Sequence, residues 1–423
     1  MEEMPYMRNL SKDDPAVAAL VGREQARVES TLDLIAAENH PPPSIMETLG
    51  SVFIIKTIEG YPGMRYHAGC VNADAVEDLA INRAQKLFGA EHVNVQPHSG
   101  TSANLAVYFS VLDAGDPVLS MSLPHGGHLS HGHRASITSR CFRFSHYTTD
   151  RKSGLIDYDE VRRIARKVRP RMIVAGASSY PRLIDYQRLA EIAHEVSAFL
   201  FADMAHLGGL VAAGVIPSPV GCCDFVTFTC YKTMMGGRGG VILCRKEHAR
   251  KIDAAVFPGC QGTSAVNSIA AKAVIFNIAS TPAFVEIQQR TLDNAVALAA
   301  ALEKKGLGIV TGGTENHQVI VDLTSRGMTG KAAEDALEAA GILTNRNMIP
   351  RDADSPGKVS GLRLGTAAVT TRGMGPAEMP LLAGLIDTAL KEVENAGALK
   401  KLSGEVRDLA GRFPVYPPAD GGE

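Results

Sequence analysis

The chain has 423 residues, of which 45% are hydrophobic and 21% charged, enough apolar material to bury the cores of two or three compact domains. Such a composition excludes a disordered or fibrous protein. Because 43 basic residues nearly balance 45 acidic ones and tryptophan is absent, we expect no broad binding of nucleic acid.

Neither a membrane span nor a secretory signal is predicted. No run of about 18 apolar residues is free of charge. The first twenty residues carry Glu2 and Glu3 and lack an apolar secretory core. The seven cysteines show no spacing typical of a disulfide framework or a zinc site. We therefore expect free thiols, no metal and a cytoplasmic location.

Residues 1–50 are predicted to form an N-terminal helical arm. Its main helix is expected over 15–37, where apolar residues recur at helical spacing up to Leu32. Three prolines after His40 cannot continue that helix.

Residues 51–280 alternate between short apolar segments and helical patterns, after a first amphipathic helix at 73–90. This alternation is typical of a mainly parallel sheet covered by helices, so we predict a large α/β domain. The expected strands are 93–95, 117–121, 172–175, 199–203, 225–228 and 240–244, and the expected helices are 102–112, 157–168 and 186–197.

Residues 281–423 do not continue the regular alternation of short strands and helices, and they predict a smaller C-terminal α+β domain. The expected elements are a long helix at 283–306, a strand at 318–323, a helix at 330–340 and a final helix at 376–395.

Three segments near the ends of predicted strands carry chemically useful groups. Pro97–Thr101 lies between a strand and a helix, where backbone N–H groups and hydroxyls can bind an anion. Asp203 ends a buried strand, where α/β sheets bind ligands. Lys232 follows the next strand, and a partly desolvated lysine can form a Schiff base. Taken singly, the three segments also fit a helix cap, a capping aspartate and a surface lysine.

Together, the three groups are the parts needed to hold pyridoxal 5′-phosphate (PLP). The segment before the helix binds the phosphate, Asp203 keeps the pyridine nitrogen protonated, and Lys232 forms the Schiff base. The sequence therefore predicts a PLP enzyme.

Longer ordered motifs show that the chain resembles the serine hydroxymethyltransferase family over roughly residues 25–395. The resemblance implies the PLP-dependent fold type I, with a mainly parallel seven-stranded sheet in the large domain. It also implies tetrahydrofolate as co-substrate and a homodimer with shared active sites, with a tetramer left open. The motifs that carry it are Leu34–Asn39, Glu59–Gly63, Asn94–Gly100, His125–Leu129, Asp203–His206, Val256–Gly259 and Gly361–Thr366.

The resemblance also implies roles for matching residues. Glu59 shuttles a proton, Arg363 grips the substrate carboxylate, and His128 stacks on the cofactor ring. The implied catalytic residues are Lys232, Glu59, Asp203, His206 and Arg363. The implied cofactor-binding residues are Ser99, Gly100, Thr101, His128, Ser178, Asp203, His206, Thr229, Lys232, Gly262 and Thr263. Substrate or folate contacts are implied for Tyr66, His67, Leu123, Gly127, Leu129, Tyr231, Asn347 and Arg363.

Several site positions depart from the family pattern. Either the changes compensate one another, with His67 and Tyr231 replacing lost contacts, or they alter substrate choice and admit a bulkier substituent on the α-carbon. The altered positions are Ala37, Thr57, His67, Tyr231, Met234, Met235, Gly237, Thr263, Ser264 and Asn267.

The sequence leaves three candidate functions for the protein. The first is a folate-linked hydroxymethyltransferase acting on serine or an α-substituted serine such as 2-methylserine, since Glu59, Tyr66, Asn347 and Arg363 are retained. The second is a folate-independent β-hydroxy-amino-acid aldolase or threonine transaldolase, suggested by the altered positions. The third is a catalytically silent relative that binds RNA or a partner protein, against which the near-neutral charge and Lys232 argue.

Overall fold

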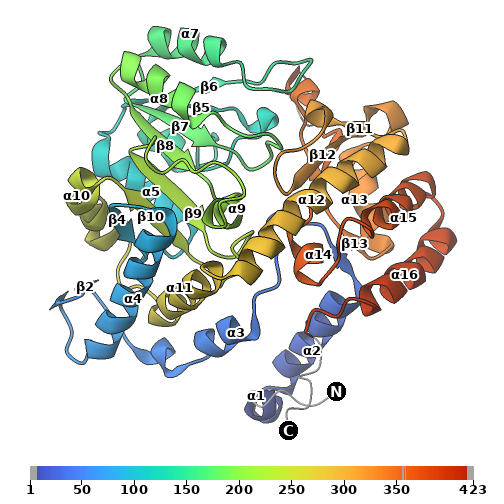
Figure 1. Ribbon diagram of the computed structural model, residues 1–423, viewed down its shortest axis with the longest axis horizontal. Coiled ribbons are helices and arrows are strands. Elements are labelled where there is room, and N and C mark those ends of the chain that lie inside the picture. The colour runs from blue at the N-terminus through green and yellow to red at the C-terminus, as the bar shows by residue number, and fades with distance from the viewer. Residues whose placement is uncertain (1–6, 355–356, 358, 417–423) are drawn as a thin grey trace.

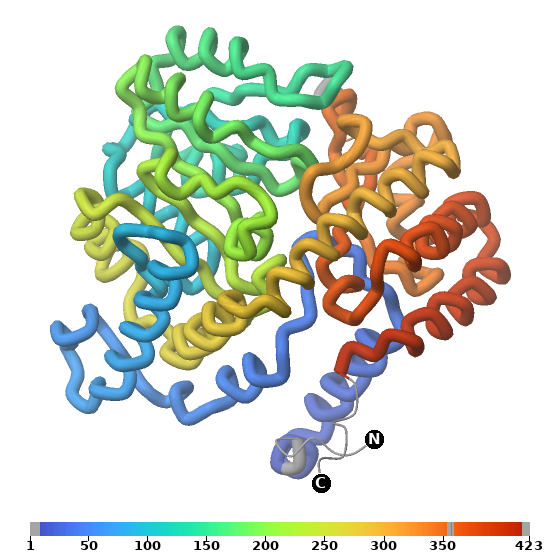
Figure 2. The backbone as a smooth tube through the Cα atoms, in the orientation of Figure 1, coloured from blue at the N-terminus to red at the C-terminus, as the bar shows by residue number. Residues whose placement is uncertain are grey.

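The computed structural model describes residues 7–354, 357 and 359–416, arranged in two lobes around two separate sheets (Figure 1). Helix α12 (Pro282–Lys304) runs from one lobe to the other. Figure 2 shows the N-terminal segment leaving the smaller lobe and passing along the larger one to a hairpin at its far edge.

The larger lobe is built on a seven-stranded sheet of order β4-β10-β9-β8-β7-β5-β6. Six strands run parallel and only β10 is antiparallel, which confirms the mainly parallel sheet that was expected. The edge strand β6 was not predicted, because its residues are mostly polar and only its last side chain is fully buried. The strands are β4 (His92–Asn94), β5 (Pro117–Met121), β6 (Arg143–Tyr147), β7 (Met172–Gly176), β8 (Phe199–Asp203), β9 (Phe225–Thr229) and β10 (Gly240–Cys244).

Helices cover both faces of this sheet. Along β7, Ile173 and Ala175 pack into one core while Met172 and Val174 pack into the other, because successive side chains point to opposite faces. The first core receives side chains from α3 (Pro43–Leu49), α4 (Val71–Phe88), α7 (Tyr158–Val168), α8 (Tyr186–Glu195), α9 (Gly208–Ala212) and α11 (Val266–Ala279). The second receives them from α5 (Gly100–Val111) and α10 (Ala249–Ala254).

The smaller lobe contains an antiparallel four-stranded sheet of order β11-β12-β15-β14. Its strands are β11 (Gly308–Ile309), β12 (Gln318–Asp322), β14 (Asn345–Asn347) and β15 (Gly361–Gly365). Its helices, besides α12, are α13 (Gly330–Ala339), α14 (Ala367–Thr371), α15 (Met379–Lys391) and α16 (Ala396–Gly411). The helix expected to be final corresponds to α15, and a further helix begins after Asn395, whose side chain caps it.

The N-terminal helix prediction was wrong at its end. After α1 (Met7–Asp13), helix α2 spans Pro15–Ser30 rather than 15–37. Leu32 instead begins strand β1 (Leu32–Asp33), which pairs with β13 (Ile342–Leu343), and its side chain enters the core of the smaller lobe. The helix stops because the amides of Leu32 and Leu34 donate to carbonyls of residues 341 and 343.

One hairpin lies apart from both sheets, at the left edge of Figure 1. It comprises β2 (Gly60–Tyr61) and β3 (Met64–Arg65), preceded by the 3₁₀ helix η1 (Val52–Ile55). Over the described ranges, no single helix is long and apolar enough to cross a membrane; α11 and α12 pass that test only together, bent by 84°.

Candidate active site

Asp203 and Lys232 come together at the carboxyl edge of the larger sheet. Asp203 ends β8, and Lys232 follows the neighbouring parallel strand β9. The backbone carbonyl of Lys232 accepts a hydrogen bond from Asn39 Nδ2 at 3.0 Å. Burial lowers the pKa of Lys232 to about 8, with Arg363 and Arg238 acting in the same direction and the charge of Asp203 opposing them. A lysine with this pKa is partly neutral near pH 7, as a nucleophilic amine requires.

Hydrogen-bond donors surround the carboxylate of Asp203. Its Oδ2 accepts from Asn104 Nδ2 at 2.8 Å and lies 2.9 Å from His131 Nε2, while Oδ1 accepts from the Ala205 amide at 3.0 Å. Although burial acts to raise the pKa of Asp203, the hydrogen bonds from His131 and Asn104 hold it well below its usual range. Asp203 is therefore a buried permanent anion, suited to a protonated ring nitrogen.

His131 was missed by the sequence reasoning. Burial raises the pKa of Tyr108 well above its usual range, so its hydroxyl remains a donor, and it lies 2.7 Å from His131 Nδ1. An imidazole that accepts from Tyr108 at Nδ1 carries its proton on Nε2 and would donate it to Asp203. The only signal in the sequence was a second histidine three positions after His128.

His128, His131 and Asp203 offer ligand atoms that lie within 4.8 Å of one another, a spacing that a metal ion would also accept. However, both ring nitrogens of His131 are engaged by Tyr108 and Asp203. The geometry therefore favours a hydrogen-bonded relay behind Asp203 over a metal centre.

The start of α5 offers a cradle for an anion. Ser99 caps the helix and forms a reciprocal capping box with Ser102. Within the described residues, the amides of Gly100 and Thr101 donate to no acceptor. A side chain at Gly100 would bring its Cβ within 2.6 Å of Thr229 Cγ2, so this approach requires glycine. Two free amides at a helix N-terminus suit a phosphate group.

His128 and His206 present neutral rings to the same region. Burial lowers the pKa of His128 to about 4, and its Nδ1 lies 2.7 Å from Ser130 Oγ. Burial also holds the pKa of His206 well below its usual range, and the ring stacks on His317 with centroids 5.6 Å apart. Nδ1 of His206 is buried and has no partner in the described part of the chain, which leaves it available to a ligand.

Arg363 reaches the site from the smaller sheet. Its Nη1 donates to Ser178 O at 2.7 Å and its Nε to Asn345 Oδ1 at 3.1 Å. Burial lowers the pKa of Arg363 to about 10, so the guanidinium stays charged at neutral pH. Its Nη2 has no acceptor among the described residues and can bind a carboxylate.

The loop after β5 lies beside these groups. Leu123 begins the 3₁₀ helix η2 (Leu123–His125), and the Gly127 amide donates to Ser122 O at 3.0 Å. The carbonyl of Gly126 accepts from the Ser178 amide at 2.7 Å, which joins this loop to Ser178. Leu129 is exposed on the same loop.

Two further predicted contacts lie on other elements. Asn347 ends β14, and its Nδ2 donates to Met348 O at 2.6 Å. Tyr231, next to the lysine, stacks under the guanidinium of Arg238, whose carbon lies 4.5 Å from the ring centroid.

Glu59, Tyr66 and His67 form a group of their own at the hairpin. They lie on and beside the hairpin, and no hydrogen bond or ion pair among the described residues joins them to Lys232. Glu59 Oε2 and His67 Nε2 are 3.5 Å apart, and both side chains are partly exposed. Tyr66 is 75% exposed and contacts Phe257 edge-on at 5.8 Å.

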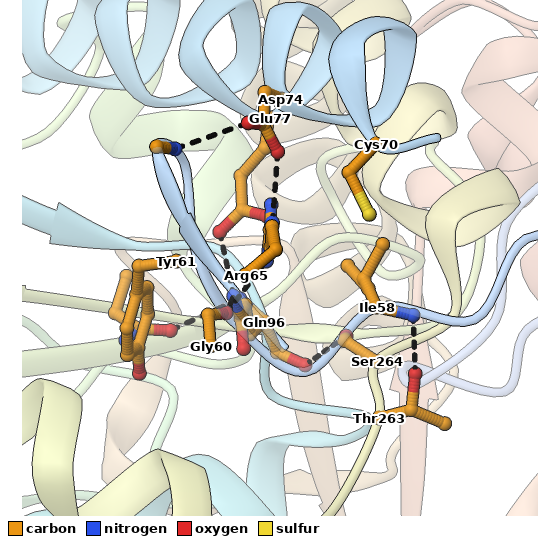
Figure 3. Close-up of polar contacts among 12 residues, drawn as sticks. Ile58, Gly60, Tyr61, Arg65, Cys70, Asp74, Glu77, Gln96, Thr263 and Ser264 are labelled. Atoms are coloured by element: carbon orange, nitrogen blue, oxygen red, sulfur yellow. Dashed lines mark hydrogen bonds and ion pairs between the residues drawn. The ribbon is translucent and has the colours of Figure 1, made fainter. Parts of the chain in front are cut away.

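Gly262 and Thr263 lie with that hairpin rather than with Lys232. Thr263 Oγ1 accepts from the Ile58 amide at 2.8 Å, and Ser264 Oγ donates to Gln96 O at 2.7 Å (Figure 3). Gly262 is exposed, with nothing within 4 Å of the position that a Cβ would take. The 261–264 loop therefore links the hairpin to the segment that leads into the phosphate cradle.

A sheet of this order, with a buried anion and a buried amine at its carboxyl edge, defines a PLP-dependent enzyme of fold type I. The cradle, Asp203 and Lys232 fit the phosphate, ring nitrogen and aldehyde of this cofactor. The family model of serine hydroxymethyltransferase matches residues 10–386, and the chain belongs to that family. It is a PLP-dependent hydroxymethyltransferase of one-carbon metabolism with an amino-acid substrate.

Proposed function

We propose that this enzyme transfers the hydroxymethyl group of serine, or of an α-substituted serine such as 2-methylserine, to tetrahydrofolate. The observation that carries the proposal is the charged Arg363 with an unengaged Nη2, held in the same buried region as Lys232 and Asp203. An α-amino acid offers the matching carboxylate to Arg363 and an amine to the position of Lys232.

PLP, when bound, draws electrons from a bond to the substrate α-carbon into its ring. Ser99, Gly100 and Thr101 hold the phosphate, and Asp203 keeps the proton on the ring nitrogen. His128 covers one face of the ring, while Ser178, His206 and Thr229 line the rest. Lys232 supplies the amine that carries the cofactor between turnovers.

The remaining residues act on the substrate. Arg363 fixes the carboxylate and thereby the orientation of the α-carbon. Glu59 accepts the proton of the β-hydroxyl as the bond between the α- and β-carbons breaks. Tyr66, Leu123, Gly127, Leu129 and Asn347 bind folate, while His67 and Tyr231 border the substrate.

A homodimer with shared active sites is part of the proposal, because no hydrogen bond or ion pair among the described residues joins Glu59, Tyr66 or Thr263 to Lys232 of the same chain. An exposed apolar patch around the hairpin supports it, since such surface on a folded chain marks an interaction site. The patch comprises Val52, Ile54, Ile55, Met64, Tyr66 and Val71. The seven free cysteines also support a reducing, cytoplasmic location.

A panel assay tests the substrate and the folate requirement together. Serine, 2-methylserine, threonine and phenylserine are each supplied with and without tetrahydrofolate, with the Lys232→Ala variant as control. We expect cleavage of serine or 2-methylserine that rises by at least about tenfold with tetrahydrofolate and is lost in the control. A cleavage rate for these substrates that does not change when tetrahydrofolate is added would contradict the proposed transfer to folate.

The contact between His67 and Glu59 favours a second candidate, a folate-independent aldolase or threonine transaldolase. His67 stands where the family has tyrosine, and it places an imidazole 3.5 Å from the proposed proton acceptor. Release of acetaldehyde from threonine, with transfer of the glycyl unit to another aldehyde, would support this candidate in the same panel.

A further inference from the structure

Lys272 is a buried cation that the proposed chemistry does not use. It lies in the middle of α11 and is 2% exposed. Its Nζ donates to three backbone carbonyls, those of Val95 at 2.6 Å, Pro97 at 3.0 Å and Gly240 at 3.0 Å. An ammonium group has three donors, so each one is used. No carboxylate among the described residues lies within ion-pair distance of it.

The three carbonyls belong to the two segments that shape the phosphate cradle. Val95 and Pro97 connect β4 to Ser99, the residue that caps α5. Gly240 begins β10, its amide donates to Pro97 O at 3.0 Å, and a Cβ on it would lie 2.3 Å from Ser99 O. Lys272 therefore ties both segments together directly behind the cradle.

Gly239, which precedes Gly240, leaves the space that the Lys272 side chain occupies. Gly239 has φ of +152°, and a Cβ at this position would lie 2.4 Å from Lys272 Cε. A larger residue would displace the lysine.

The cradle itself contains only neutral donors. In the described part of the chain, no cationic side chain forms a hydrogen bond or ion pair with Ser99, Gly100 or Thr101. Burying an ammonium without a carboxylate in contact with it is costly, and the three carbonyl dipoles and the more distant charge of Glu77 offset only part of that cost. Burial lowers the pKa of Lys272 to about 8, so most of the lysine is charged at neutral pH. A phosphate in the cradle adds further negative charge across a medium of low dielectric constant.

We propose that Lys272 is a positioning residue for the phosphate group of PLP, which holds the Val95–Pro97 and Gly240 segments in place and attracts the phosphate through its buried charge. This inference rests on the proposed phosphate site at Ser99–Thr101.

The test compares the affinity of the apoprotein for PLP with its affinity for pyridoxal, which lacks the phosphate. Lys272→Met and Lys272→Gln remove the charge, and Ser268→Ala, on the same helix, removes only a hydrogen bond to Arg238 O. We expect both Lys272 variants to bind PLP about tenfold or more weakly, with pyridoxal affinity changed by less than about twofold. Ser268→Ala should match the wild type for both compounds.

Equal losses for PLP and pyridoxal, or no loss for either, would overturn the assignment. Failure of both Lys272 variants to fold would also overturn it, since the lysine would then serve the fold alone. If the wild type binds PLP no more tightly than pyridoxal, the proposed phosphate site itself fails. If the wild type prefers PLP and the variants keep that preference, only the role of Lys272 fails.

Discussion

The two buried lysines of this enzyme differ in what surrounds their amines. Lys272 donates to three carbonyls and is fixed in place. Lys232 has no side-chain hydrogen bond among the described residues, and burial lowers its pKa to about 8 while Asp203 acts to raise it. An amine that is partly neutral and makes no hydrogen bond can react with an aldehyde. An ammonium whose three N–H groups all donate to backbone carbonyls cannot.

The pKa of Lys232 predicts how its reactivity depends on pH. Only the neutral amine condenses with an aldehyde, and the neutral fraction rises as pH increases through about 8. The rate at which apoprotein condenses with PLP, followed by absorbance, should therefore rise steeply from pH 6 to 8 and flatten above about pH 9. The same scan with a free lysine derivative corrects for the titration of the aldehyde. A protein curve that keeps rising beyond pH 10 would show an unperturbed lysine.

At the scale of single elements, the hairpin that carries the proposed proton acceptor is anchored by a buried ion-pair cluster (Figure 3). Arg65 on β3 pairs with Glu77 at 2.5 Å and Asp74 at 2.8 Å, both on α4, and the Arg65 and Glu77 side chains are 4% and 1% exposed. Gln96 Nε2 donates to Glu77 Oε1 at 2.7 Å and to Gly60 O at 3.0 Å. The hairpin is thus held against the same segment that leads into the phosphate cradle.

Glu77→Gln should destabilise the enzyme by about 3 kcal/mol, because it leaves Arg65 buried with one of its two carboxylates removed. Glu160→Gln on α7 breaks an exposed pair with Arg163 and should leave stability unchanged. Chemical denaturation of both variants measures the difference. An unchanged denaturation midpoint in Glu77→Gln would show that the cluster does not anchor the hairpin.

At the scale of the whole molecule, the site lies where the two lobes meet. Arg363 of the smaller lobe donates to Ser178 of the larger one, and His317 of the smaller lobe stacks on His206 of the larger. We propose a domain boundary near residue 280, as the sequence suggests, with an N-terminal arm over residues 1–50 whose β1 packs in the smaller domain. Among the described residues no hydrogen bond or ion pair joins Glu59 to Lys232 or Arg363, which supports the proposal that a second copy supplies it.

Mixing two inactive variants tests that requirement. If Glu59 acts on the partner's Lys232, a heterodimer of Glu59→Gln and Lys232→Ala chains contains one intact site, and exchange of subunits should restore about a quarter of wild-type activity. Asp203→Asn mixed with Lys232→Ala is the matched control, because both residues come from the same chain in each site. This control should stay inactive, and restoration in neither mixture would contradict shared sites.

The architecture and the two principal reactive groups, Asp203 and Lys232, could be predicted from local patterns in the sequence. Strands 117–121, 199–203 and 240–244 are observed with the bounds that were expected, because continuous apolar runs of this length are a local signal. Asp203 and Lys232 were found for the same reason, since each follows such a strand directly and the carboxyl ends of parallel strands meet at one edge.

Which residues support those groups depends on contacts that form when distant segments of the chain fold together. His131 lies 72 positions from Asp203 in the chain, and nothing in its own segment reveals that partner. Leu32 fits a helical pattern locally, yet the amide of Leu32 bonds to Gly341 and the residue adopts strand structure. Lys272 sits in an apolar helix and meets carbonyls of Val95 and Gly240 only after folding. Local periodicity records which face of an element is buried, whereas long-range hydrogen bonds depend on where distant segments meet.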